Sequence, residues 1–155
     1  MTTEERAQLI DRYEQGYAAV VAALDGIGEE EWAQREAPGE WSVREIVHHL
    51  GDSEMAAAVN LRLMLAQDNP VLAGYDHEQW ARVLHQGFPV EGSLAAFAGA
   101  RAATVPLLRS MTEADWLRAG TFADGEAHDP ATWISWYGGH AHGHADQIRR
   151  ARAAR

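Results

Sequence analysis

The stretch that decides the fold of this chain is Trp41-Ser42-Val43-Arg44-Glu45-Ile46-Val47-His48-His49-Leu50. Ser42 and Glu45 have the spacing of a capping box, in which each side chain accepts a hydrogen bond from the backbone N–H of the other residue. Trp41 and Ile46 stand at the two positions of a hydrophobic staple around that box. The stretch therefore predicts a helix that begins at Ser42, and the apolar periodicity that follows extends it to about Ala66.

Three further segments repeat apolar residues with the period of a helix, at about residues 3–24, 93–110 and 129–153. The last begins at Asp129-Pro130, a good N-cap followed by proline at the first helical position. Its other end carries the basic cluster, which complements the negative end of the helix dipole: Arg149, Arg150, Arg152 and Arg155. These segments predict an all-α fold.

The connections between these segments predict the order of the helices in space. Residues 67–92 are too long for a tight turn between two helices. A connection of this length can cross the bundle, so that the helices over 42–66 and 93–110 lie parallel to each other. Residues 27–40 and 111–128 each carry an acidic run into tryptophan, which weakly favours two related helical hairpins. No segment alternates convincingly as a strand.

Composition limits the classes of function. A chain of 155 residues fits one domain, residues 1–155, which is large enough to bury a core. The absence of cysteine excludes disulfides, thiolate metal sites and cysteine nucleophiles. A formal net charge of -10 argues against nucleic acids and anionic membranes as partners. The sequence has no stretch of membrane-spanning length and no signal-peptide pattern, so we expect a cytoplasmic protein.

Three histidines make the strongest candidate site. His140 and His144 are four residues apart, so on a helix both imidazoles project from one face. His49, from the helix over 42–66, would complete a three-nitrogen metal site. If the two helices are antiparallel, His49 and His144 lie roughly 10 Å and 15 Å from the same end of the bundle, at about 1.5 Å per residue. Their levels then differ by about one turn, although spacing alone fits hydrogen-bonded core histidines equally well.

The other five histidines are expected to play lesser parts. We expect His48 to lie off the inward face of its helix and His142 to be exposed. His77, His85 and His128 fall in connections, where a surface position is the simpler interpretation and a role at the rim of a site is the alternative. The Glu-x-x-His pairs of di-iron bundles and the His-Glu-x-x-His motif of zinc proteases are absent.

Side chains near the three histidines are candidates for supporting roles. Asp52, three residues after His49, can orient that imidazole or accept a proton as a catalytic base. Gln147 can play a similar orienting part on the last helix. Three aromatic residues can line an apolar pocket beside the metal, although an aromatic stripe is also typical of plain core: Trp133, Trp136 and Tyr137.

Several motifs occur together along most of the chain: residues 38–50 (PGEWSVREIVHHL), Asp68-Asn69-Pro70 with Gly74-Tyr75-Asp76, and His140 and His144 followed by Gln147-Ile148. In these motifs and their order the chain resembles the DinB/YfiT-like superfamily of metal-dependent enzymes. The resemblance implies a four-helix bundle with an up-down-down-up course and the long crossover between the second and third helices. It also implies one divalent metal, commonly zinc or nickel, on His49, His140 and His144, and it makes a homodimer plausible.

The leading hypothesis is a metal-dependent enzyme that acts on a small molecule. Three neutral imidazoles leave a metal ion with an open coordination position. The ion can activate a water for hydrolysis or bind a low-molecular-weight thiol for transfer, and members of the family include hydrolases as well as thiol-dependent transferases and isomerases. The alternative is a non-catalytic helical module in which the metal site is structural or vestigial.

Overall fold

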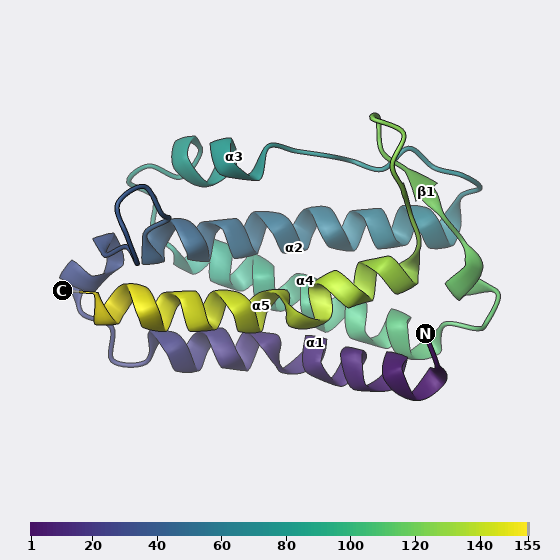
Figure 1. Cartoon of the computed structure of the whole chain (residues 1–155), viewed down its shortest axis with the longest axis horizontal. Coiled ribbons are helices and arrows are strands. Elements are labelled where there is room, and N and C mark those ends of the chain that lie inside the picture. The colour runs from purple at the N-terminus through teal and green to yellow at the C-terminus, as the bar shows by residue number, and fades with distance from the viewer. Residues whose placement is uncertain (155) are drawn as a thin grey trace.

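A computed structural model describes residues 1–154, so that Arg155 of the basic cluster lies outside the described residues. Four long helices form a bundle (Figure 1): α1 (Thr3–Leu24), α2 (Val43–Ala66), α4 (Glu91–Ser110) and α5 (Pro130–Ala153). The connections hold the shorter elements: η1 (Glu29–Ala33), α3 (His77–Val83), η2 (Asp115–Leu117), β1 (Gly120–Thr121) and β2 (Ala127–His128). The prediction of an all-α four-helix bundle is confirmed.

The helices follow an up-down-down-up course. In Figure 1, α1 and α5 run toward one end of the bundle, and α2 and α4 run toward the other. The chain between α2 and α4 returns along the outside of α2 and carries α3 on its way, which makes α2 and α4 parallel. α1 packs mainly on α5 and α2 mainly on α4, while α2 also contacts α5.

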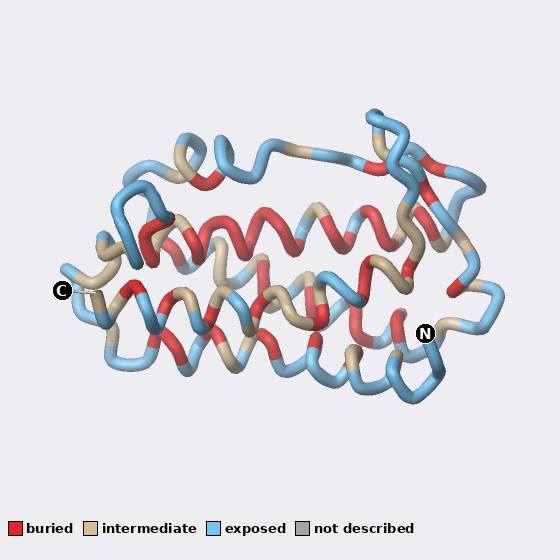
Figure 2. The backbone as a smooth tube through the Cα atoms, viewed as in Figure 1, coloured by how far each residue is buried: buried red, intermediate tan, exposed pale blue. Residues whose placement is uncertain are grey.

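The start of α2 forms as the sequence predicts. The Oγ of Ser42 accepts from the backbone N–H of Glu45 at 3.2 Å, and the carboxylate of Glu45 accepts from the N–H of Ser42 at 2.7 Å. Trp41 and Ile46 are both buried beside this capping box, in the place of the hydrophobic staple. Figure 2 shows that α2 is buried along most of its length, because α4, α5 and the crossover with α3 all pack on it.

A buried polar network crosses the middle of the bundle, and the sequence did not reveal it. Arg101 of α4 donates from Nε to Glu54 of α2 at 2.9 Å and also donates to the backbone oxygen of Tyr13 on α1. The hydroxyl of Tyr13 donates to the other oxygen of Glu54. A Cβ at Gly16 would collide with the guanidinium, so the glycine makes room for it. The network ties three helices together at one level.

A small β-hairpin departs from the expectation that the chain has no strand. β1 and β2 are antiparallel strands of two residues each, too short for any periodicity to be visible in the sequence. Thr121 also exchanges backbone hydrogen bonds with Pro70 and Leu72 of the crossover, at 2.9 Å each. The hairpin and the crossover are thereby joined into one cover over the bundle. None of the described helices has the length and apolar character needed to span a membrane.

Removal of either charge from the buried ion pair should destabilise the protein strongly. Glu54→Gln or Arg101→Met leaves the other charge buried without its partner, a loss that costs about 3–5 kcal/mol. The double variant E54Q/R101M removes both charges and should lose less than the sum of the two single variants. Urea denaturation measures the free energy of unfolding of each variant. Single variants as stable as the wild type would show that the ion pair does not stabilise the fold.

Candidate metal centre

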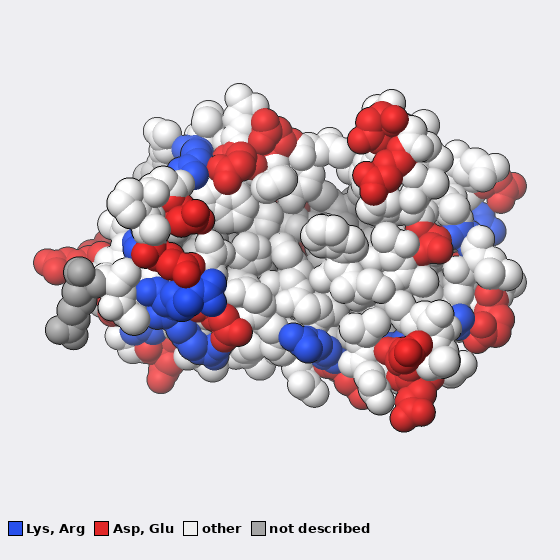
Figure 3. Space-filling view, viewed as in Figure 1, with Lys and Arg blue, Asp and Glu red and all other residues white. Residues whose placement is uncertain are grey.

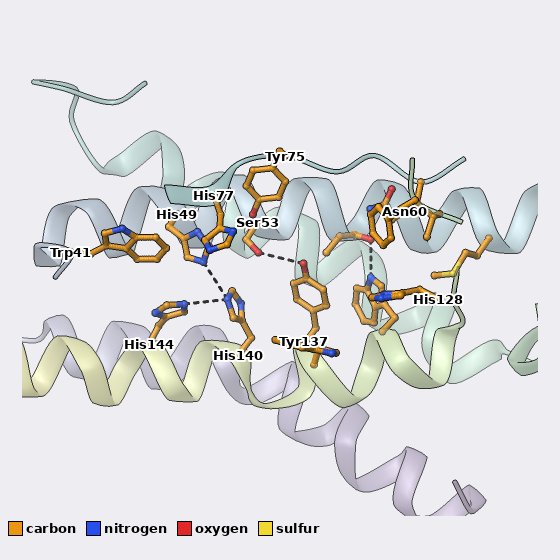
Figure 4. A pocket seen from close by; sticks show the side chains of 16 residues that line it. Trp41, His49, Ser53, Asn60, Tyr75, His77, His128, Tyr137, His140 and His144 are labelled. Atoms are coloured by element: carbon orange, nitrogen blue, oxygen red, sulfur yellow. Dashed lines mark hydrogen bonds between the residues drawn. The ribbon is translucent and has the colours of Figure 1, made fainter. Parts of the chain in front are cut away.

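The structure brings the three predicted histidines together between α2 and α5. His140 is central: its Nε2 lies 3.2 Å from Nε2 of His49 and 3.1 Å from Nε2 of His144 (Figure 4). All three nitrogens lie within 4.8 Å of one another. The i, i+4 spacing on α5 supplies two of the imidazoles, and the antiparallel course of α2 brings the third to the same level.

This donor set fits a single divalent ion. Three nitrogens bound at about 2.0–2.1 Å to one tetrahedral ion would lie about 3.3 Å apart, close to the spacings of His140 with its two neighbours. Gln147 supports the arrangement, because its Oε1 accepts from Nδ1–H of His144 at 2.8 Å. A neutral imidazole that is protonated at Nδ1 has its free lone pair on Nε2, the atom that faces the other two rings.

Burial keeps the three imidazoles neutral. Burial, together with the neighbouring rings of His144 and His77, lowers the pKa of His49 to about 3. Burial also holds the pKa of His140 well below its ordinary value and lowers that of His144. At neutral pH all three are therefore in the form that binds metal ions.

The three histidines open onto a cavity of about 430 Å³. α2 and α5 form its walls, and the crossover and the β-hairpin cover it, as the labelled residues from both helices and both connections show in Figure 4. Its volume is within the usual range for small-molecule sites. The histidines lie toward one end of this cavity, with Trp41 beside them.

The three aromatic residues predicted to line a pocket do line this cavity. Trp133 is buried and donates from Nε1 to the backbone oxygen of Ala57 at 2.9 Å, whereas Trp136 is 71% exposed at the rim. The hydroxyl of Tyr137 lies 3.4 Å from Oγ of Ser53, near the histidines. Burial raises the pKa of Tyr137 to about 12, so at neutral pH the phenol keeps its proton and can donate a hydrogen bond.

Asp52 faces away from this cavity. Its Oδ2 lies 2.7 Å from Nε2 of His85, and it is not among the residues that line the cavity. The ring of His85 stacks on that of His48, with centroids 4.3 Å apart, and Nδ1 of His48 lies 2.8 Å from Oγ of Ser93. His48 does not point toward α5, as expected from its position off the inward face. It is nevertheless buried, because it lies between α2, α4 and the crossover.

Several residues of the cavity were not singled out as site residues in the sequence. The ring centroid of Trp41, predicted only as a staple, lies 4.5 Å from that of His49. Ser53 lies four residues after His49, on the same face of the helix, and this spacing is the signal that the sequence offers for it. Tyr75 comes from the crossover, where no periodic pattern indicates which side chains point inward. His77 and His128 line the cavity, in agreement with the alternative interpretation of these two residues as part of the rim of a site.

Comparison with known proteins finds relatives along most of the chain. The family model described as the DinB superfamily matches residues 12–148. Two proteins named "Putative metal-dependent hydrolase" are 36% identical over 80 residues (Oceanobacillus iheyensis) and 28% identical over 111 residues (Halalkalibacterium halodurans). These matches cover 52% and 72% of this chain and 46% and 65% of the relatives. The chain thus spans about half to two thirds of the length of these relatives.

A solved structure shares the fold. YfiT from Bacillus subtilis superposes with a TM-score of 0.88 and 25% sequence identity, over 96% of this chain and 86% of that chain. It is described as a probable metal-dependent hydrolase with an unusual four-helix bundle topology. The match supports both the predicted family and the predicted bundle.

The hydrogen bond from His144 to Gln147 should strengthen metal binding at the three-histidine cluster. Gln147→Met removes the acceptor that orients the imidazole, and loss of such a partner lowers metal affinity by roughly 10–100-fold. Competition with a chelator at neutral pH measures the affinity for Zn²⁺. Gln15→Met, an exposed change on α1, is the matched control and should leave the affinity unchanged. Equal affinities for the two variants would rule out this role of Gln147.

Proposed function

The chain belongs to the DinB superfamily, and we propose that it is a metal-dependent hydrolase that acts on a small molecule. The observation that carries the proposal is the cluster of three neutral imidazoles, with Nε2 atoms directed at one another, at one end of a cavity between α2 and α5. The names of the relatives from Oceanobacillus iheyensis and Halalkalibacterium halodurans support the same class of reaction.

His49, His140 and His144 would hold the ion. Imidazole nitrogens suit zinc and nickel, and we propose one of these as the natural metal. An ion held there with an open coordination position would act as a Lewis acid and lower the pKa of a coordinated water toward neutrality. Gln147 fixes the ring of His144 by accepting its Nδ1–H.

The residues beside the cluster would bind and orient the substrate. The phenol of Tyr137 keeps its proton and can donate to the carbonyl oxygen of an ester or amide, where negative charge develops during hydrolysis. Ser53, 3.4 Å from that phenol, can hold its orientation. Trp133 and its apolar neighbours would lower the polarity around a bound substrate, which strengthens these hydrogen bonds.

Loss of one histidine from the cluster should abolish hydrolysis. His140→Ala removes the central nitrogen, so the zinc-loaded variant should hydrolyse a p-nitrophenyl ester at least about 100-fold more slowly than the zinc-loaded wild type. His142→Ala is the matched control on the same helix, because His142 contacts the backbone oxygen of Arg12 and not the cavity. Bound zinc is measured in each preparation.

Two outcomes would overturn this proposal. A wild type that binds zinc, unfolds on chelation and turns over no ester or amide would favour a structural metal site. A wild type that reacts only when glutathione or another low-molecular-weight thiol is added, and incorporates the thiol into its product, would be an S-transferase.

The hydroxyl of Tyr137 should act on the rate more than on substrate binding. Tyr137→Phe removes the donor and should lower kcat by roughly 100-fold, the size of the effect found when one oxyanion donor is removed, with a smaller change in KM. Tyr17→Phe is the control, because Tyr17 packs on Phe97 outside the cavity. An unchanged kcat in Y137F would show that the hydroxyl does not meet the reacting carbonyl.

A further inference from the structure

The cavity is divided along α2 into a polar half and an apolar half. The histidine cluster and the hydroxyls of Ser53, Tyr75 and Tyr137 lie on one side of the division. The walls beyond them are mainly apolar: Ala57, Met64, Leu72, Phe122 and Trp133. At 1.5 Å per residue, roughly 16 Å separate Ser53 from Met64 along the helix. The apolar half is therefore long enough for an extended chain.

The polar groups of the apolar half already have partners. The indole N–H of Trp133 donates to the backbone oxygen of Ala57. Nε2 of His128, which also lines this end (Figure 4), lies 3.0 Å from Oε1 of Glu126. The amide of Asn60 donates to the backbone oxygen of Ala73 and accepts from its N–H, both at 2.9 Å. A polar or charged group of a ligand would find few free partners here, and burial of an unpaired polar group is costly.

The cavity offers an anion neither an arginine nor a lysine side chain among the described residues. The whole chain has no lysine. Two exposed carboxylates stand at its edge instead. Glu78 accepts from the indole N–H of Trp41 at 3.1 Å and pairs with Arg82, and Glu126 lies 3.0 Å from His128.

The acidic groups flank the entrance. Figure 3 shows acidic side chains on α3 and on the β-hairpin, on either side of a hollow in this face. Arg82 offsets the charge of Glu78, whereas Glu126 has no arginine partner within residues 1–154 and opposes the entry of anionic molecules. A bound divalent ion would attract negative charge only at the histidine end, so the far end of the cavity keeps its preference for an uncharged group.

We infer that the substrate is an uncharged ester or amide whose acyl part is an extended apolar chain. The inference rests on the proposed hydrolase function and specifies its substrate class. The carbonyl lies beside Tyr137, and the chain runs past Ala57 toward Met64. In the reaction the acyl C–O or C–N bond breaks and a bond forms between the acyl carbon and the oxygen of water. One proton of that water goes to the leaving alcohol or amine, and the acyl group leaves as a carboxylic acid.

Binding to the metal-free protein tests the substrate class without the reaction. N-methyloctanamide and its analogue with a carboxylate at the far end of the chain form a matched pair. Quenching of the tryptophans that line the cavity reports their binding. The neutral amide should bind at least roughly tenfold more tightly, because the carboxylate would lose hydration in the apolar half without gaining a partner.

A change in the apolar wall tests the position of the chain. Ala57→Leu fills part of the apolar half, and Ala66→Leu is an exposed control on the same helix. In A57L the affinity for N-methyloctanamide should fall about tenfold or more, and the zinc-loaded variant should lose octanoyl ester hydrolysis more than acetyl ester hydrolysis. A66L should match the wild type in both measurements. The matched pair on the wild-type protein remains decisive if A57L does not fold.

The outcomes separate this inference from the proposed function. Equal affinity of the wild type for the neutral and carboxylate-ended amides would overturn the substrate class, even with esters hydrolysed at the metal. So would a folded A57L with an unchanged preference for octanoyl over acetyl esters. Selective binding of the neutral amide by a protein that hydrolyses neither ester would support the ligand class and overturn the hydrolase.

Discussion

The packing of α2 between α4 and α5 is the constraint on which the rest of the structure depends. One side of α2 carries Glu54 into the buried ion pair with Arg101, and another turns His49 toward the two histidines of α5. Because Glu54 lies only five residues after His49, the network that fixes α2 against α1 and α4 also fixes the level of this imidazole. The bundle thus holds three imidazole nitrogens together, and burial favours the neutral form of their rings.

Much of the fold was visible in the sequence because its signals are local. The capping box of Ser42 and Glu45 and the N-cap of Asp129 mark the helix starts, and the length of the 67–92 segment permits the parallel arrangement of α2 and α4. The start of α4 differs from expectation by two residues, at Glu91 instead of Ser93. This difference is within the usual uncertainty of helix ends.

The pocket was harder to predict because only some of its residues follow from local sequence patterns. The others depend on how the helices and connections pack together. His140 and His144 share a helix face by spacing, while the level of His49 depends on how two helices dock. The covering residues Tyr75 and Phe122 lie in segments held by a hairpin of two-residue strands, which leave no periodic trace. The buried pair of Glu54 and Arg101 was not recognised either, because charged residues in a helical pattern are ordinarily on the solvent face.

The two ends of the cavity suit different parts of a ligand. The histidine end suits a divalent ion and a reacting carbonyl, and the Trp133 end suits an uncharged apolar chain. A second histidine cluster, with His48, His85 and Asp52, lies on another side of α2 and does not line the cavity. The central claim is that the metal binds at the first cluster and not at the second.

Anomalous diffraction from crystals grown with Zn²⁺ tests this claim most directly. The account predicts one strong zinc peak at about 2.0–2.1 Å from Nε2 of each of His49, His140 and His144. A peak between His85 and Asp52, or only at exposed carboxylates, with none at the three Nε2 atoms, would contradict it.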